Sequence, residues 1–419
     1  MRGPMTTSRR VFLRQGAFAL VSLGFAPSFL SRTVLATSRA GARKRLIAVF
    51  QRGAVDGLNV VVPFGEPDYA RARPSIAIGA PTTKGGAIDL NGFFGLHPKL
   101  APLLPLWRQR QLAIIHACGS PDATRSHFDA QDYMETATPG VKRTDTGWLN
   151  RYLQARPDDA ASPVRAVALT PQLPRAFQGP APVLAVGQLG QFGIRAAQAS
   201  RAMSTSFEEE YARASDQVLG TTAREAFDAM RQLGSLDLAK YHPAGGASYP
   251  KSAFGTALQQ IAQLAKSDVG LEVAFAEVGG WDTHVNQGAA DGQLANRLDD
   301  FAEALAALVT DLGDQMADTV VLTMSEFGRA VAENGNRGTD HGHGNVMLVM
   351  GGGVGGGRVL GRWPGLTREQ RHDGRDLAVT TDFRDVFAEV VTRHLGLADA
   401  SAVFPGYALD AARFPGLWS

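Results

Sequence analysis

The sequence has almost no cysteine, and its aromatic residues are few. Cys118 is the single cysteine among 419 residues, so the chain cannot form an internal disulfide even in an oxidising compartment. Cys118 lies at the end of an apolar run at residues 112–118, and we interpret it as a small residue of the core. Aromatic residues make up 8% of the chain and are not interleaved with basic runs, which argues against nucleic-acid binding.

Long apolar segments are absent beyond the N-terminal region. Residues 8–14 read SRRVFLR, and an apolar stretch at residues 16–30 and small residues at 34–36 follow. This order is typical of a twin-arginine export signal, and the apolar stretch is short for a membrane span. We therefore predict a signal peptide at residues 1–36 and a single domain at residues 37–419. The folded protein would be exported to the periplasm or secreted, with no membrane span after cleavage.

A strong excess of charge of either sign is also missing. The chain has 42 Lys+Arg and 40 Asp+Glu, a net charge of +2. Five arginines and no acidic residue fall within residues 1–36, so residues 37–419 carry 37 basic and 40 acidic residues, or −3. The processed protein is thus predicted to be weakly acidic, which gives no electrostatic reason to expect a polyanionic partner.

Strand-like and helical patterns alternate along the rest of the chain. Apolar, β-branched runs predict strands at residues 46–50, 112–117, 164–169, 183–186, 271–278, 319–324 and 346–350. Amphipathic patterns predict helices at residues 207–233, 252–266, 290–312 and 381–394. No linker-like tract interrupts them. The pattern predicts one α/β domain, a three-layer α/β/α sandwich with a large, mostly parallel sheet.

Polar side chains follow several of the predicted strands. In open α/β sheets ligands bind outside the carboxyl ends of the strands, so these clusters are candidate site residues. Carboxylates and imidazoles at such ends suit a divalent metal, typically zinc. The clusters are RGAVDGLN at residues 52–59, SHFD at 126–129, GGWDTH at 279–284, SEFGR at 325–329 and DHGH at 340–343, and the candidate metal ligands are Asp56, Asp282, His284, Asp340, His341 and His343.

Each cluster also has a purely structural interpretation. Asp56 precedes a glycine and could simply form a tight turn. Asp282 and His284 are two residues apart, so in an extended segment they point the same way, either toward a metal or toward each other. Ser126 could cap a helix with Asp129 three residues later, or act as a nucleophile at a helix N-terminus. The sequence leaves these alternatives open.

The ordered set of motifs resembles the DUF1501 family, which is itself similar to the alkaline phosphatase/sulfatase superfamily. The motifs are RGAVDGLN, SHFDAQDY, TGWLNRYL, GGWDTH, SEFGR and DHGHGN. The resemblance implies an alkaline-phosphatase-like α/β/α fold with a metal site at the strand ends. It also implies that Asp56 binds metal, that Ser126 is a nucleophile, and that Asp282 and residues 340–344 supply further ligands.

The chain departs from the superfamily pattern in two places. Glu326 and Phe327 stand where an Asp-His pair is expected, and Asn286 stands where a histidine is common. A one-metal site, a shifted site and a degenerate, non-catalytic site are all compatible with these departures. Whether Glu326 replaces a ligand or orients one stays open.

Two functions follow from this reasoning. The first is a metal-dependent hydrolase of phosphate or sulfate esters, with a small anionic ester as substrate. In that case the metal activates Ser126 or water, and Arg52 or Arg329 grips the anion in its guanidinium fork. Glu326 belongs to the same catalytic set. The alternative is a non-catalytic binding or assembly protein on the same fold, exported with a protein partner.

Overall fold

A computed structural model describes residues 20–21, 43–157, 162–189, 229, 232–233 and 240–418. The predicted signal at residues 1–36 lies outside these ranges except for residues 20–21. Almost all of the predicted helix at residues 207–233 lies outside them as well. Within the described ranges, no helix combines the length and the apolar character needed to cross a bilayer.

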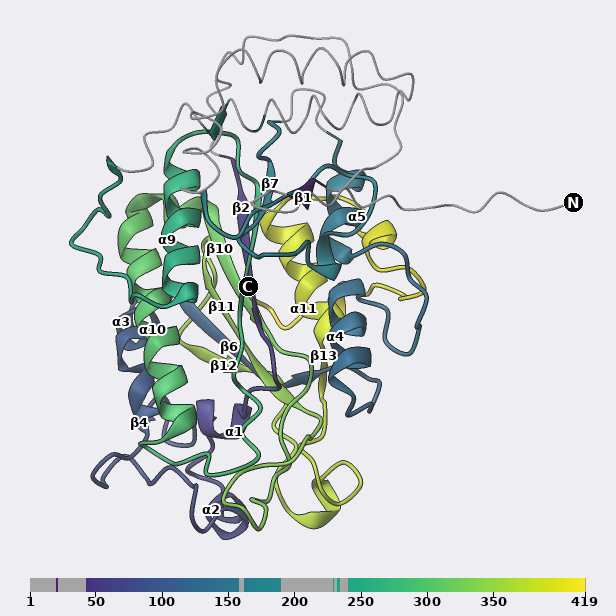
Figure 1. Ribbon diagram of the computed structural model, residues 1–419. Coiled ribbons are helices and arrows are strands. Elements are labelled where there is room, and N and C mark those ends of the chain that lie inside the picture. The colour runs from purple at the N-terminus through teal and green to yellow at the C-terminus, as the bar shows by residue number, and fades with distance from the viewer. Residues whose placement is uncertain are drawn as a thin grey trace, which may run out of the picture.

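A ten-stranded sheet runs through the centre of the described structure (Figure 1). Strands β8, β7, β9, β2 and β10 are mutually parallel, β11 is antiparallel to both of its neighbours, and β6 pairs in parallel with β12 and β13. The order across the sheet is β1 (Leu20–Val21), β8 (Leu184–Ala185), β7 (Ala166–Ala168), β9 (Val273–Val278), β2 (Arg45–Gln51), β10 (Thr319–Met324), β11 (Asn345–Gly351), β6 (Leu112–Gly119) and β12 (Arg358–Leu360), with β13 (Thr381–Asp382) also on β6.

Side chains of the central strands alternate between two hydrophobic cores. On β2, Ile47 and Val49 join one core, whereas Leu46, Ala48 and Phe50 join the other. A strand buried on both faces reads as a continuous apolar run because successive side chains point to opposite faces. The predicted α/β sandwich with a mostly parallel sheet is therefore confirmed.

Helices cover both faces of the sheet, as Figure 1 shows. One layer contains α3 (Leu104–Arg108), α9 (Ala253–Lys266) and α10 (Gln293–Leu312); the other contains α4 (His127–Thr136), α5 (Trp148–Ala155) and α11 (Phe383–Glu389). Ser252 caps α9 by accepting a hydrogen bond from the Gly255 amide, as its place before an apolar run favours. Helix α10 begins at Gln293 rather than at residue 290, because Gly292 (φ +124°) breaks the helical backbone there.

Several elements were not expected from the sequence. These are the short helices α1 (Gly57–Val60) and α2 (Pro67–Ala72), helix α5, the edge strands β12 and β13, and a small second sheet of β3 (Val61–Val62), β5 (Gly95–Leu96) and β4 (Ile88–Asp89). Each strand in this group has only two or three residues, too few to show a period of two in the sequence. The C-terminal helix ends its α-helical part at Glu389 and continues as a π-helical turn, Val390–His394.

The strand directions bring distant parts of the chain to one edge of the sheet. Strands β2, β9 and β10 are parallel neighbours, so the loops after Gln51, Val278 and Met324 leave at the same edge. Because β11 runs the other way, the loop before Asn345 reaches that edge too. Strand β6 is antiparallel to β11, so the loop after Gly119 also leaves there. The polar clusters of the sequence are thus neighbours in space.

Two buried histidines are part of the core and lie outside these clusters. His116 places its Nε2 3.0 Å from the Val61 carbonyl oxygen, and its Nδ1 accepts from the Ala117 amide at 2.9 Å. His394 places its Nε2 2.9 Å from the Arg45 carbonyl oxygen. Burial lowers the pKa of each imidazole to about 4. Both rings are therefore neutral in the folded protein at neutral pH.

The lowered pKa values of His116 and His394 predict that the protein loses stability in acid. A histidine has a pKa of about 6.5 in the unfolded chain. Between pH 6.5 and 4 the unfolded state therefore binds more protons than the folded state, and the free energy of unfolding falls as the pH falls. Each histidine is expected to contribute on the order of 3 kcal/mol to this loss. Urea unfolding at pH 7 and pH 4.5 measures it.

The variant His116→Gln separates this contribution from that of the carboxylates. Glutamine can donate to a carbonyl and accept from an amide, but it does not titrate. We expect a smaller difference in unfolding free energy between pH 7 and pH 4.5 than in the wild-type chain. The exposed His242→Gln serves as the control and should leave the difference unchanged. A His116→Gln chain as acid-sensitive as the wild type would contradict the interpretation.

Candidate metal centre

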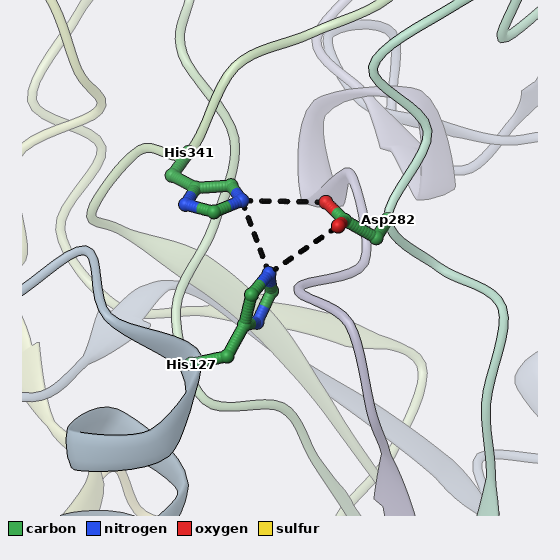
Figure 2. A group of neighbouring side chains, drawn as sticks. All are labelled: His127, Asp282 and His341. Atoms are coloured by element: carbon green, nitrogen blue, oxygen red, sulfur yellow. Dashed lines mark hydrogen bonds and ion pairs between the residues drawn. The ribbon is translucent and has the colours of Figure 1, made fainter.

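Three side chains from three separate segments of the chain meet at this edge of the sheet, as Figure 2 shows. His127 is the first residue of α4, Asp282 follows β9, and His341 precedes β11. The two Nε2 atoms of His127 and His341 are 3.0 Å apart. Asp282 Oδ1 lies 3.3 Å from His341 Nε2, and Asp282 Oδ2 lies 3.5 Å from His127 Nε2. Within the described part of the chain, these residues form the one such group of potential ligands.

A fourth side chain, His284, lies against the same group. Its Nε2 is 2.9 Å from His341 Nε2 and 3.0 Å from Asp282 Oδ1. Its Nδ1 lies 3.3 Å from Asp340 Oδ1, which also accepts from the Asn334 amide nitrogen at 2.9 Å. The structure thus brings the predicted ligands Asp282, His284 and His341 together, and it places Asp340 behind His284 as a hydrogen-bond partner.

Hydrogen bonds fix the protonation of the two central imidazoles. His341 Nδ1 lies 2.9 Å from the Arg125 carbonyl oxygen, which can only accept, so Nδ1 carries the proton. His127 Nδ1 lies 2.7 Å from Glu326 Oε1 and donates to that carboxylate. In neutral rings, both Nε2 atoms then carry lone pairs, and these face each other across 3.0 Å. The contact is favourable when a positive charge lies at this point, either a proton on Nε2 of His127, whose pKa the hydrogen bond to Glu326 raises, or a metal ion shared with the Asp282 carboxylate.

The donor set fits a tetrahedral zinc ion. Ligand atoms at 2.0–2.1 Å from zinc lie roughly 3.3 Å from one another in a tetrahedron. The two Nε2 atoms are 3.0 Å apart, and the Asp282 carboxylate lies at similar distances, with Oδ1 3.3 Å from His341 and Oδ2 3.5 Å from His127. About a quarter of the His127 and His341 side chains and 45% of the Asp282 side chain are exposed, so the group opens to solvent. Catalytic zinc sites typically have three protein ligands and one position open to water.

Glu326 lies behind His127 and is ionised there. Burial alone would raise the pKa of the Glu326 carboxyl, but hydrogen bonds from His127, Gln131 and the Gly53 amide hold the pKa below its usual range. In turn, the hydrogen bond to Glu326 raises the pKa of His127. The structure therefore places Glu326 behind His127, as a hydrogen-bond partner of this candidate ligand, with its own carboxylate outside the group of potential ligands.

Arg329 forms an ion pair with Asp282, and its guanidinium group is surrounded by hydrogen-bond acceptors of the protein. Its side chain is buried, and Nη2 donates to Asp282 Oδ1 at 2.5 Å. Its other hydrogen bonds go to the backbone carbonyls of residues 53, 54, 281 and 339 and to His284 Nε2, 3.4 Å from Nη1. Burial would raise the pKa of the Asp282 carboxyl, but the hydrogen bond and charge of Arg329 lower it overall. The prediction that Arg329 grips a substrate anion is not supported, because a buried guanidinium with these partners does not reach a substrate.

Arg52 is likewise neutralised by its own surroundings. Its Nε donates to Glu277 at 2.5 Å, and its Nη1 donates to Glu135 at 2.9 Å and to Gln131 at 3.0 Å. It lines a pocket of about 360 Å³ with Arg175, Glu277 and residues 171–174. With two carboxylates on one guanidinium, Arg52 is a weak candidate for the predicted anion clamp.

Two predicted ligands face away from the group. The Asp56 side chain is buried and pairs with Arg73 Nη1 at 2.6 Å, and it accepts from Gln287 Nε2 at 2.7 Å. His343 is buried against His372, with ring centroids 4.4 Å apart. The structure therefore does not bring the predicted ligands Asp56 and His343 into the group: Arg73 balances the charge of the buried Asp56 carboxylate, and the His343 ring packs against His372.

Ser126 is the N-cap residue of α4. Its side chain accepts from the Asp129 amide at 3.4 Å, which is the capping role that the sequence offered as an alternative to a nucleophile. The residue that the sequence reasoning missed is its neighbour, His127. The signal available for His127 was its place at the start of the helix that follows a buried strand, at the edge where the other ligands were expected.

Because Glu326 contacts His127, we expect that removing the Glu326 charge lowers the affinity for the metal. In Glu326→Gln the carboxylate charge is removed while the shape is kept, so zinc affinity should fall about 10- to 100-fold. Competition with a chromophoric chelator measures the affinity. Glu277→Gln removes a neighbouring carboxylate that pairs with Arg52 and should leave the zinc affinity unchanged. Equal affinities in all three proteins would contradict the role given to Glu326.

For a variant of Asp56 we expect the opposite result, a loss of stability without a loss of zinc. Removing one partner of a buried ion pair leaves the other uncompensated, so Asp56→Asn should lower the free energy of unfolding by about 3–5 kcal/mol. Zinc stoichiometry of the folded protein should not change, because Asp56 pairs with Arg73 rather than with the metal group. Unfolding curves and elemental analysis of the same preparation test both statements. Loss of zinc from folded Asp56→Asn would return Asp56 to the ligand set.

The comparisons with known proteins concern the fold and the family. The search of curated proteins found no match. Solved structures with some similarity include the C-terminal periplasmic domain of EcEptC from Escherichia coli in complex with zinc (9% identity, TM-score 0.35, covering 75% of this chain and 74% of that chain). Another is the PsFucS1 sulfatase from Pseudoalteromonas sp. (11% identity, TM-score 0.38, 89% and 72%). A third is the lipoteichoic acid synthase LtaP from Listeria monocytogenes (11% identity, TM-score 0.30, 68% and 57%).

The family assignment comes from the sequence itself. The family model described as "Protein of unknown function (DUF1501)" matches residues 43–406, which is most of the chain. The match spans every strand of the sheet from β2 to β13 and every residue of the candidate metal centre. The chain therefore belongs to the DUF1501 family.

Proposed function

We propose that this protein is an exported hydrolase of phosphate or sulfate esters that depends on a divalent metal. One observation carries the proposal: two imidazoles with fixed Nδ1 protons direct their Nε2 lone pairs, together with the Asp282 carboxylate, to one point at an open sheet edge. The SRRVFLR motif at residues 8–14 supports export.

The chain's own residues divide into holding and orienting groups. His127, Asp282 and His341 hold the metal, and His284 lies against the Asp282–His341 edge. Glu326 and the Arg125 carbonyl orient the two imidazoles, and Arg329 keeps Asp282 ionised and in place. A divalent metal bound there would act as a Lewis acid on an ester oxygen and would lower the pKa of a water molecule that it holds.

The site supports one metal ion rather than two. The aromatic ring of Phe327 packs against His127 and His341, with centroids 4.9 and 5.1 Å away. Phe327 stands where the superfamily pattern has a histidine, and Asp56, a ligand in that pattern, pairs with Arg73. An apolar ring and a neutralised carboxylate remove two donors that a second metal would need.

Water is the nucleophile that this geometry favours. The Ser126 oxygen caps α4, so a serine nucleophile would give up a helix-capping contact in order to react. Two histidines and a carboxylate with one open position are typical of zinc hydrolases that activate water. We therefore propose water rather than Ser126 as the nucleophile, and this choice can be tested directly.

The activity itself is tested with generic esters. Purified from the periplasm without chelator, the protein should contain about one equivalent of zinc. It should hydrolyse a p-nitrophenyl phosphate or sulfate ester, lose the activity on chelation and regain it with added zinc. Asp282→Asn and His341→Ala should lose both the metal and the turnover. A protein that keeps its zinc but hydrolyses no ester in a broad phosphate and sulfate panel would favour the binding or assembly alternative.

The nucleophile is tested at Ser126. In Ser126→Ala the protein should keep its zinc, lose about 1 kcal/mol of stability because the helix cap is lost, and keep its turnover within about tenfold. Ser126→Asn, which keeps a capping side chain but lacks the hydroxyl, serves as the control for stability. If both variants keep their zinc but lose turnover by about 10³-fold or more, Ser126 is the nucleophile and water is not.

A further inference from the structure

The pocket beside Arg52 lies at the same edge of the sheet as the metal centre. Glu277 lines it near the end of β9, and Arg52 lines it directly after β2. Residues 171–174 also line the pocket, and they follow β7. Strands β2, β7 and β9 are parallel, so their ends share one edge. The volume of about 360 Å³ falls within the usual range for small-molecule sites, which makes the pocket a candidate binding site beside the metal centre.

Helix α4 connects the pocket to the metal centre. His127, Gln131 and Glu135 are spaced four residues apart, so they lie on one face of the helix. His127 Nδ1 and Gln131 Nε2 contact Glu326 Oε1 at 2.7 and 2.9 Å. Further along the helix, Arg52 Nη1 donates to Gln131 Oε1 at 3.0 Å and to Glu135 Oε1 at 2.9 Å. At about 1.5 Å per helical residue, Arg52 lies between about 6 and 12 Å along α4 from His127, so a small ester can span both sites.

The charges around the pocket cancel one another. Arg52 pairs with two glutamates, and Arg175 Nε donates to Asp132 Oδ1 at 2.6 Å. Burial and the charge of Arg175 lower the pKa of Arg151, which therefore adds a third guanidinium close by. The group then holds three positive and three negative charges, those of Arg52, Arg151, Arg175, Asp132, Glu135 and Glu277. A balanced group gives neither an anion nor a cation a net attraction, so an uncharged ligand fits the pocket best.

Both members of the Arg52–Glu277 pair keep hydrogen-bonding capacity for a ligand. Arg52 uses Nε and Nη1, and Glu277 uses Oε2; Nη2 and Oε1 have no hydrogen-bond partner among the residues that the structure describes. The two side chains are 24% and 33% exposed. A free donor and a free acceptor suit hydroxyl groups, each of which both donates and accepts. Pro171, Leu173 and Pro174 add apolar surface for the C–H groups of such a ligand.

We propose that this pocket binds the uncharged, hydroxyl-rich part of the substrate, a sugar ring, while the anionic ester group lies at the metal centre. This inference rests on the proposed function and names the class of its substrate, a phosphate or sulfate ester of a sugar. A sugar needs paired donors and acceptors with apolar surface between them rather than a net charge, and the pocket has these features. Arg52 and Glu277 are then binding residues for its hydroxyl groups.

The experiment measures sugar binding apart from turnover. Methyl glycosides of common hexoses, deoxyhexoses and pentoses, which carry no phosphate or sulfate, are titrated calorimetrically into the zinc-loaded and the zinc-free full chain. Cyclohexanol, inorganic phosphate and inorganic sulfate are the comparison ligands. The variants are Glu277→Gln, which removes the carboxylate, and Gln172→Trp, which fills the pocket from an exposed position. Gln109→Trp, the same substitution at an exposed residue just before β6, is the matched control.

The expected result is binding of at least one glycoside to the wild type, with and without zinc. Its affinity should fall about tenfold or more in Glu277→Gln and in Gln172→Trp, while elemental analysis shows that zinc is retained. Gln109→Trp should bind like the wild type. The value of kcat/KM for the phosphate or sulfate ester of that sugar should fall in Gln172→Trp, whereas the value for the corresponding methyl ester should not change.

Two further outcomes separate this inference from the proposed function. If the wild type holds no zinc and hydrolyses no ester but its glycoside binding depends on Glu277 and Gln172, the sugar site stands and the metal-dependent hydrolase fails. If the wild type holds zinc and hydrolyses simple esters but binds no glycoside of the panel, the sugar site is overturned and the hydrolase stands. Cyclohexanol or an inorganic anion binding as tightly as the glycosides, with the same loss in both variants, would also overturn it.

Discussion

The metal centre depends on where two protons are fixed. The Arg125 carbonyl and the Glu326 carboxylate each hold the Nδ1 proton of one imidazole, which leaves the Nε2 lone pairs of His341 and His127 only 3.0 Å apart. This contact is favourable with a proton or a metal ion between the two nitrogens, and the hydrogen bonds that hold the Nδ1 protons direct both Nε2 atoms to the same point. The roles of Glu326, Arg125 and Arg329 all follow from keeping these donors aimed at one point.

The fold makes this arrangement possible by combining strand directions. Parallel β2, β9 and β10 deliver Arg52, Asp282 and Glu326 to one edge, and antiparallel β11 allows His341 to arrive there from a preceding loop. Strand β6 then leads to His127 at the start of α4. A purely parallel sheet would have needed another crossover to bring residues 340–343 to this edge.

Much of the fold could be predicted because its signals are local. The strands at residues 46–50, 112–117, 271–278, 319–324 and 346–350 are long apolar runs, and the structure has β2, β6, β9, β10 and β11 there. The polar residues that follow these strands can also be recognised in the local sequence, so Asp282, His284 and His341 could be selected as candidates. Short strands such as β12 and β13 have too few residues to show an alternation of side chains between two faces, so they were not predicted.

The partners of each charged group could not be predicted, because they come from distant parts of the chain. The Asp56 side chain is buried because it forms an ion pair with Arg73, and the RGAVDGLN motif alone does not indicate that ion pair. Arg329 looks like an anion clamp in the sequence, yet four backbone carbonyls and Asp282 surround it. In the sequence His127 looks like part of a helix cap, and its contact with Glu326, 199 residues away, makes it a candidate ligand only in the folded chain.

The most direct test of the metal centre is a crystal structure of the zinc-loaded protein with anomalous data at the zinc edge. The account predicts one anomalous peak, bound by the Nε2 atoms of His127 and His341 and by a carboxylate oxygen of Asp282, at about 2.0–2.1 Å. His343 and Asp56 should show no contact with it. A peak bound by other residues, or no peak at saturating zinc, would contradict the account.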